Sequence, residues 1–170
     1  MKHVVLLAAF AIITVCCPAQ TYISLAPSLT NEAGTLAEKT NLALEVGRQW
    51  DVFSLGIDVG KTSLGKIEGR DTTAYLEIRP NLNIFQQGKF TNTFTAGIGV
   101  VFNSAQSLMT ELTSGIEYAF RPKIHLNVFF GQYYYSGRYE SSSATFFGIS
   151  VMHYFAAVRS RPLITQKTEK

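Results

Sequence analysis

Residues 93–102 read Thr-Phe-Thr-Ala-Gly-Ile-Gly-Val-Val-Phe. The side chains at 94, 96, 98, 100 and 102 are all apolar, and those between them are Thr, Gly and one Val. Successive side chains of a β-strand point to opposite faces, so this period of two predicts a strand with one apolar face and one face of small residues. The stretch therefore indicates a sheet whose two faces meet different surroundings.

The same alternation recurs in eight separate runs between Tyr22 and Phe155. They span residues 22–30, 41–49, 51–60, 72–85, 90–103, 110–121, 123–135 and 143–155. Pro80, in the fourth run, has no N–H for a hydrogen-bonded ladder, and we expect a local bulge to accommodate it. A chain of this length suits one domain, so the runs predict a single all-β sheet.

The alternation alone leaves open which face lies inside. A secreted, lipocalin-like barrel that binds a small apolar ligand buries its apolar face, whereas a membrane barrel turns that face to lipid. A water-exposed exterior would carry many Lys and Glu, but the polar face here is mostly Gly, Ala, Ser, Thr and Asn. Small residues suit the narrow, filled interior of an eight-stranded barrel. We therefore predict an all-β, eight-stranded, antiparallel, up-and-down transmembrane β-barrel.

A few charged residues interrupt the predicted interior face. They are Glu45, Asp58, Glu77, Arg79, Glu111 and Glu117. We expect a structural polar network with Arg79 as its cationic centre, near Glu45, Glu111 or Glu117 across the lumen. The surplus carboxylates would be protonated, solvated or paired with Arg121.

The connections between the runs alternate in length. Residues 49–51, 86–89 and 121–123 are short links, whereas residues 31–40, 61–71, 104–109 and 136–142 are longer ones. An up-and-down barrel with both termini in the periplasm places the first, third, fifth and seventh connections outside the cell. These are the long ones, so we predict that the long loops are extracellular.

Aromatic residues gather near both predicted membrane boundaries, where their rings suit the headgroup region. At the periplasmic rim they are Trp50, Phe85, Phe90, Phe120 and Phe155, and at the outer rim Phe102, Tyr133, Tyr134 and Tyr135. We expect them to form two aromatic girdles. The alternative for the three tyrosines is that they simply continue a long seventh strand.

Both ends of the chain differ from the eight runs. Lys2 and His3 precede an apolar stretch that ends in Cys17-Pro18-Ala19, which predicts a secretory signal peptide over residues 1–19. The residues before Cys16 and Cys17 do not fit a lipidation site, and a chain cut after Ala19 has no cysteine. We predict a barrel domain over residues 20–155 and a polar, disordered periplasmic tail over 156–170, with a docking peptide as the alternative for the tail.

From Tyr22 to Phe155 the chain resembles the small eight-stranded outer-membrane barrels of the OmpA and OmpX type. Architecture carries the resemblance, without a diagnostic motif. It implies that the barrel assembly machinery recognises a last strand ending in an aromatic residue, here Phe155 in Met152–Phe155. The chain departs from the pattern by continuing past Phe155, and this tail is too short for the peptidoglycan-binding domain of OmpA-like proteins.

Some eight-stranded barrels act on lipid A and need a His with a Ser, and usually a carboxylate, near the outer leaflet. After residue 19 the chain has only His125 and His153, both expected at the periplasmic end. We therefore predict no catalytic residues and no enzymatic activity, with a lipid A-modifying enzyme as the alternative. Two separate histidines form no recognisable metal site, and we expect neither a metal nor a cofactor.

The remaining charged residues indicate which binding partners to expect. The near-neutral charge balance argues against nucleic acid, while Lys61, Lys66 and Arg70 in the second long connection could meet lipopolysaccharide phosphates. Ordinary solvated loop charge is the alternative. We predict a monomeric outer-membrane barrel of structural or surface-interaction type, in contact with lipid and lipopolysaccharide, whose long loops could bind a surface ligand.

Overall fold

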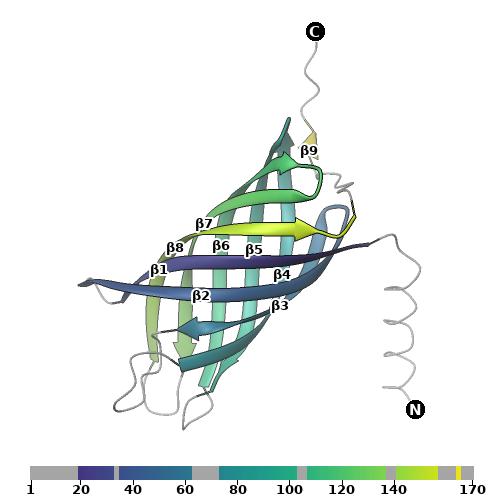
Figure 1. Ribbon diagram of the computed structural model, residues 1–170. Helices are drawn as coiled ribbons and strands as arrows, with labels where there is room; N and C mark the ends of the chain where they lie inside the picture. Colours follow the sequence, from purple (N-terminus) through teal and green to yellow (C-terminus); the bar gives the residue numbers. More distant parts are fainter. Residues whose placement is uncertain are drawn as a thin grey trace, which may run out of the picture.

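Eight long antiparallel strands form a closed barrel in the computed structural model, which describes residues 19–32, 35–62, 73–102, 107–136, 141–156 and 164–165 (Figure 1). The strands are β1 (Gln20–Glu32), β2 (Thr35–Trp50), β3 (Phe53–Thr62), β4 (Thr73–Gln87), β5 (Phe90–Val101), β6 (Ser107–Arg121), β7 (Ile124–Ser136) and β8 (Ser141–Tyr154). Each pairs with the next, and β8 pairs with β1 to close the sheet. The predicted fold class is confirmed.

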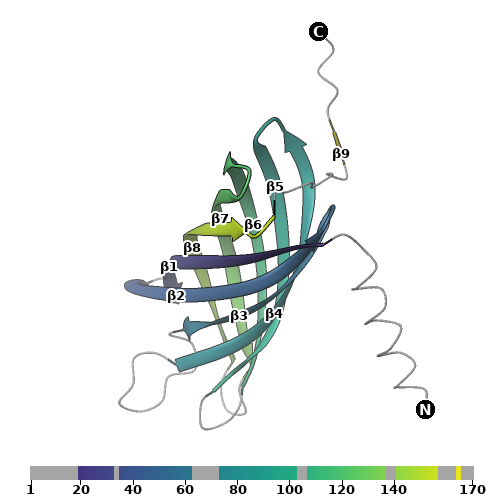
Figure 2. The same cartoon turned by 45° about the vertical axis from the view of Figure 1, so that its right-hand side comes forward.

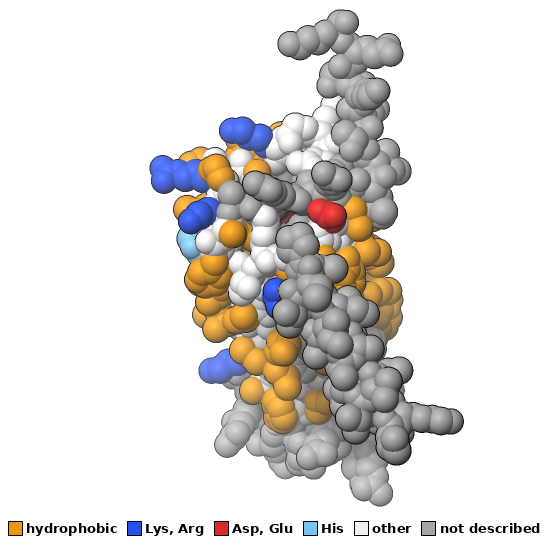
Figure 3. All heavy atoms as spheres, turned by 90° about the vertical axis from the view of Figure 1, so that its right-hand side faces the viewer, with side chains coloured by type: hydrophobic (Ala, Val, Ile, Leu, Met, Phe, Trp, Pro, Cys, Tyr) orange, Lys and Arg blue, Asp and Glu red, His pale blue; other side chains and the backbone are white. Residues whose placement is uncertain are grey.

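The barrel exterior is apolar. Side chains at alternate positions of every long strand point outward, and large ones remain open, such as Ile57 at 56% and Phe130 at 63% exposure. Figure 3 shows hydrophobic side chains along the middle of the face that it draws. Moving this belt from water into lipid is favourable by about 25 cal/mol per Å² of apolar surface, so the surface belongs in a bilayer.

Three two-residue turns lie at one end of the barrel, which we call the turn end. They are Asp51–Val52, Gly88–Lys89 and Pro122–Lys123. The φ angles of Asp51 and Gly88 are 42° and 61°, in the left-handed region that Gly enters freely and Asp tolerates. Phe155 N–H donates to Thr21 O at 3.0 Å, so the first and last long strands also meet here.

The opposite end, which we call the loop end, holds the other four connections. The first of them differs from its prediction as a loop over residues 31–40. β1 and β2 continue as a paired ribbon through Leu29↔Thr40 to Glu32↔Thr35, with one register shift. Residues 33–34, between the two strands, and the centres of the other three connections lie outside the described residues.

Pro80 is accommodated without the predicted bulge. It pairs with Leu55 of β3 in unbroken register, and the β4–β5 ladder keeps one register from Ile78↔Ile98 to Asn81↔Thr95. The register shift of β4 lies between Asn83 and Phe85 instead. That part of the strand has passed the start of β3, so it is free to bend there.

A ninth strand, β9 (Ile164–Thr165), pairs parallel with Phe85 and Gln86 of β4. β3 begins opposite Leu82, which leaves the last residues of β4 with an open edge on that side. The sequence analysis predicted no strand in the tail. The rest of the tail after Ala156 lies outside the described residues, as do residues 1–18, which include most of the predicted signal peptide.

Candidate functional site: the lumen and the two rims

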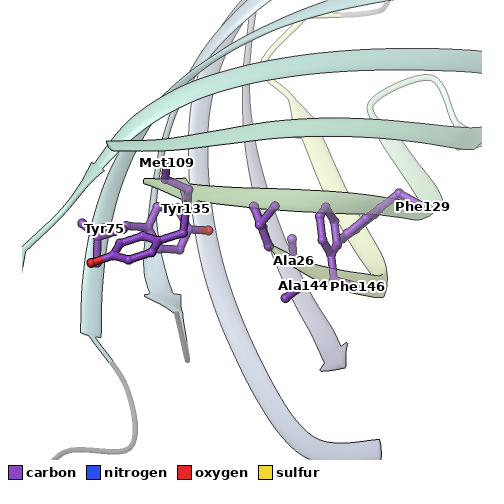
Figure 4. Packing of buried hydrophobic residues seen from close by; sticks show 9 residues of the cluster. Ala26, Tyr75, Met109, Phe129, Tyr135, Ala144 and Phe146 are labelled. Carbon is purple, nitrogen blue, oxygen red and sulfur yellow. The ribbon is translucent and has the colours of Figure 1, made fainter. Parts of the chain in front are cut away.

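The strands tilt around an enclosed lumen (Figure 2), and its loop-end half holds an apolar cluster. This inner apolar cluster consists of Ala26, Tyr75, Val101, Met109, Phe129, Tyr133, Tyr135, Ala144 and Phe146. Figure 4 shows them packed between strands on opposite sides of the lumen. The ring centroids of Tyr133 and Phe146 are 4.1 Å apart, nearly stacked. Close-packed rings fill this half of the barrel.

A charged layer lies below the cluster, towards the turn end. Three carboxylates face one another directly on neighbouring strands, in the order Glu45↔Asp58↔Glu77. Like charges placed opposite one another on a sheet destabilise it. The next inward residue of β4 is Arg79, and its position supplies the compensating cation.

Arg79 joins two carboxylates across the lumen. Its Nη1 donates to Glu45 Oε2 and its Nη2 to Glu111 Oε1, both at 2.8 Å. Tyr22 OH also donates to Glu45, and Thr113 Oγ1 to Glu111. Charge-assisted hydrogen bonds of this kind are the strong ones in proteins, so this group ties β1, β2, β4 and β6 together.

The other two carboxylates of the layer differ in their partners. Asp58 Oδ2 accepts a hydrogen bond from Tyr75 OH at 2.7 Å. Neither carboxyl oxygen of Glu77 has a hydrogen-bond partner among the described residues, although the side chain is fully buried. A buried polar group without a partner costs free energy, and Glu77 is therefore the least compensated residue of the network.

Glycines provide the space for these side chains. A Cβ added to Gly56 would overlap the carboxyl of Glu45, and one added to Gly97 would overlap that of Glu77. Small barrels fill their interior by alternating small and large residues. Gly56 and Gly97 are thus required by the charged layer.

A third layer lies nearest the turn end. His125 Nδ1 is hydrogen-bonded to Glu117 Oε1, and the His125 ring packs against that of Tyr154 at 4.8 Å. Tyr154 OH donates to Gln49 Oε1 at 2.8 Å. Glu117 is therefore the partner of His125 and not of Arg79. Arg121, which was considered as a partner for the interior carboxylates, lies exposed with its guanidinium over the Phe120 ring.

The lumen leaves little free space between these layers. The cavity lined by Glu45, Arg79, Glu117, Ser150 and Tyr154, among others, has a volume of about 30 Å³. That is room for one or two water molecules and for no larger ligand. No group of His, Cys, Asp and Glu suited to a metal ion occurs among the described residues.

The tyrosine triplet divides between the two faces of β7. Tyr134 points outward and donates its OH to Gln132 Oε1 at 2.8 Å, whereas Tyr133 and Tyr135 are buried in the lumen. An outer girdle containing all three was therefore wrong for Tyr133 and Tyr135. The period of two explains this, because residues two apart on a strand share a face.

The aromatic residues predicted for the periplasmic rim all lie at the turn end. Trp50 stacks on Phe53 with centroids 6.0 Å apart, and Phe90 lies against Tyr118 at 4.9 Å. Phe120 and Phe155 are exposed, and Phe85 is half-buried. Lys61 is exposed at the loop end of β3, while Lys66 and Arg70 lie outside the described residues.

Four tyrosines of the lumen were not predicted to take part in the polar network. Tyr22 and Tyr75 donate to Glu45 and Asp58, Tyr154 donates to Gln49, and Tyr135 donates to Ser107. Their signal was their position, since each stands in register with the small polar residues of its strand.

Solved structures share the fold of this barrel. Outer membrane protein H (OprH) of P. aeruginosa matches with a TM-score of 0.61 and 11% identity over 80% of this chain and 99% of its own. Neisserial surface protein A (NspA) matches with a TM-score of 0.57 and 11% identity over 81% of this chain and 97% of its own. The fold is that of the small eight-stranded outer-membrane barrels.

A de novo designed transmembrane β-barrel matches almost as well, with a TM-score of 0.52 and 11% identity over 78% of this chain and 94% of the designed one. A designed protein has this architecture without an inherited role, so the outer-membrane barrel fold does not by itself define a function. No protein-family model matches the sequence, and no curated protein matches it. Among the described residues, no helix is long and apolar enough to span a membrane.

Proposed function

We propose that this outer-membrane barrel is a monomeric, non-enzymatic protein with a structural or surface-interaction role. One observation carries the proposal: an apolar exterior surrounds a lumen whose described side chains pack closely, and the cavity between its charged layers has a volume of about 30 Å³. That cavity has no room for a substrate or an aqueous pore. What remains available for recognition is the loop end.

The proposed orientation puts the turn end in the periplasm and the loop end outside the cell. It is supported by the two-residue turns, because short turns are typical of the periplasmic side of such barrels. Residues 1–19 then act as a signal peptide, and the assembly machinery binds the last strand at Phe155. The tail after Phe155 lies in the periplasm, where β9 keeps part of it near β4.

The orientation of the barrel can be tested with two epitope tags, each in a separate bacterial strain. A tag inserted after Arg138 should bind antibody on intact cells, whereas a tag inserted after Gly88 should bind only after the outer membrane is permeabilised. The reverse pattern would overturn the orientation.

A second experiment tests the filled lumen. Purified protein in planar bilayers should show no stable ion conductance, and conductance steps as large as those of an open pore would contradict a filled lumen.

A lipid A-modifying enzyme is less well supported. His125 is hydrogen-bonded to Glu117 inside the barrel, and His153 lies outside against Phe155 with ring centroids 5.5 Å apart. Both are at the turn end, away from the leaflet that holds lipid A. Unchanged lipid A in a deletion strain is the expected result.

We also propose that Lys61, with Lys66 and Arg70, contacts lipopolysaccharide phosphates. The exposed position of Lys61 at the loop end supports this. Replacing all three with Gln should weaken binding of purified lipopolysaccharide and reduce its salt dependence, while Lys39→Gln, which removes a cation of β2 outside the proposed contact, serves as the control. Unchanged binding by the triple variant would rule out the contact.

A further inference from the structure

Charges of opposite sign are separated in this barrel. Five of the six acidic side chains that the structure describes face the lumen, and Asp51 is the exception. Outside the lumen, the described cations are Arg48, Lys61, Lys89, Arg121 and Lys123, and all except Lys61 lie at the turn end. Figure 3 shows Lys and Arg side chains at the upper end of the surface, above hydrophobic ones.

The four turn-end cations, Arg48, Lys89, Arg121 and Lys123, are joined by hydrogen-bonded backbone, and we call them the basic arc. Ala119 N–H donates to Lys89 O at 2.8 Å, which places Lys89 beside the β6 residues that lead to Arg121. Tyr154 N–H donates to Lys123 O at 2.8 Å. Thr21 pairs with Arg48 on one side and accepts a hydrogen bond from Phe155 on the other. The arc therefore follows neighbouring strands from β5 through β8 and β1 to β2.

Both arginines of the arc are held against aromatic rings. The guanidinium carbon of Arg48 lies 5.9 Å from the ring centroid of Trp50, and that of Arg121 lies 5.7 Å from that of Phe120. A guanidinium packed over a ring face still presents N–H groups at its edge. Arg48 Nε is buried and has no hydrogen-bond partner among the described residues.

Trp50, Phe120 and Phe155 lie at this rim, beside the end of the apolar belt. Aromatic side chains of this kind mark the headgroup level of a bilayer. The basic arc consequently lies at the depth of lipid phosphates, and Arg binds phosphate oxygens with two parallel N–H groups.

We propose that the basic arc is a binding site for the phosphate groups of acidic phospholipids in the leaflet that meets the turn end. Each lipid phosphate sits beside an arginine of the rim, and Lys89 and Lys123 add the positive charge that favours acidic over zwitterionic headgroups. The site goes beyond the structural and surface role proposed above, since it lies at the opposite end of the barrel from the loops.

Trp50 is the only tryptophan of the chain, so it can report on neighbouring lipid. The folded protein in micelles of a zwitterionic detergent is titrated with dansyl-labelled phosphatidylglycerol or phosphatidylcholine, and energy transfer from Trp50 is recorded. Phosphatidylglycerol should bind more tightly than phosphatidylcholine, and added salt should weaken the binding of phosphatidylglycerol. The double variant Arg48→Gln with Arg121→Gln should weaken phosphatidylglycerol binding by about five-fold per lost charge.

Lys39→Gln is the matched control, because it removes one cation from the loop-end part of β2, where Lys39 pairs with Thr30. It should leave phosphatidylglycerol binding unchanged. Lys89→Gln with Lys123→Gln is a second variant on exposed turns, in case the arginine changes impair folding, and heat-modifiable gel migration checks folding of each. Equal binding of the two lipids, or equal loss in Lys39→Gln, would overturn the proposal. Displacement by inorganic phosphate as effective as by phosphatidylglycerol would indicate a free-phosphate site and overturn it as well.

Discussion

The guanidinium of Arg79 is the one cation within a layer that also holds Glu45, Asp58, Glu77 and Glu111, as far as the described residues show. It touches two of the four directly at 2.8 Å. Desolvation of charges is costly, and a buried pair that loses one partner leaves an uncompensated charge. The effect of a substitution here depends on which contacts it removes, more than on the size of the side chain.

Arg79→Met should therefore destabilise the barrel strongly. It keeps much of the volume but leaves Glu45 and Glu111 without their cation, and we expect a loss of about 3–5 kcal/mol in the free energy of unfolding. The measurement is unfolding by urea in detergent, with heat-modifiable gel migration as the readout of the folded fraction. Arg79→Lys retains the charge and should lose less. Equal stability of Arg79→Met and wild type would contradict the role of Arg79.

Glu77→Gln should behave differently from Glu45→Gln. Glu77 has no hydrogen-bond partner to lose among the described residues, so its neutralisation should leave the barrel as stable or make it more stable. Glu45→Gln removes the charge that faces Arg79 and replaces one of the two oxygens that accept from Arg79 and Tyr22 with an amide NH2, and it should cost about 1.5–3 kcal/mol. The same unfolding assay compares the two isosteric changes, and a larger loss for Glu77→Gln would refute the difference.

At the scale of an element, β7 shows how the period of two assigns neighbouring residues to different surroundings. Tyr133 stacks on Phe146 in the lumen, whereas Tyr134 is 44% exposed on the outer surface. Removing a buried aromatic side chain creates a cavity in a packed region, while removing an outward one does not. The two positions form a natural matched pair.

Tyr133→Ala should cost about 3–5 kcal/mol in the free energy of unfolding, and Tyr134→Ala less than about 1 kcal/mol. Thermal unfolding of the two variants in the same detergent measures the difference. Similar losses at both positions would mean that the inward and outward assignment of β7 is wrong.

The period of two predicted the eight long strands, and the small residues of the polar face predicted which side of the sheet lies inside. Glu45, Asp58, Glu77 and Arg79 share the inward face because each has the right parity, and Arg79 was expected near Glu45, Glu111 or Glu117. Parity says nothing about how deep a residue lies or how far it reaches across the lumen. For that reason Glu117 was not assigned to His125, and the apolar cluster around Phe146 was not foreseen.

The ends of the strands are the second feature in which the structure differs from the prediction. β2 begins at Thr35 because its ladder with β1 continues past the residues that the alternation identified. β9 exists because β4 extends beyond β3, and the resulting open edge follows from the register of two distant segments. Neither feature has a local signature in the sequence.

At the scale of the whole molecule, the apolar residues are distributed between an outer belt and an inner cluster, and the charges between the lumen and the turn end. This arrangement suits a bilayer, since lipid covers the belt and the closed sheet leaves no unpaired edge within the hydrocarbon. Residues 93–101 lie on β5, with Ile98 outward and Thr95 buried in the lumen.

The most direct test of the inside-out barrel is a cysteine scan along residues 93–102. A chain that starts at Gln20 has no cysteine, so single cysteines can carry a spin label in lipid vesicles at these positions. Gly97 and Gly99 are left out, because an added Cβ there would overlap Glu77 or the backbone of Leu76. Even-numbered positions should be accessible to oxygen dissolved in lipid, and odd-numbered positions should be shielded from it. Accessibility without a period of two, or even-numbered positions open to a water-soluble nickel reagent, would contradict a transmembrane barrel with its apolar face in lipid.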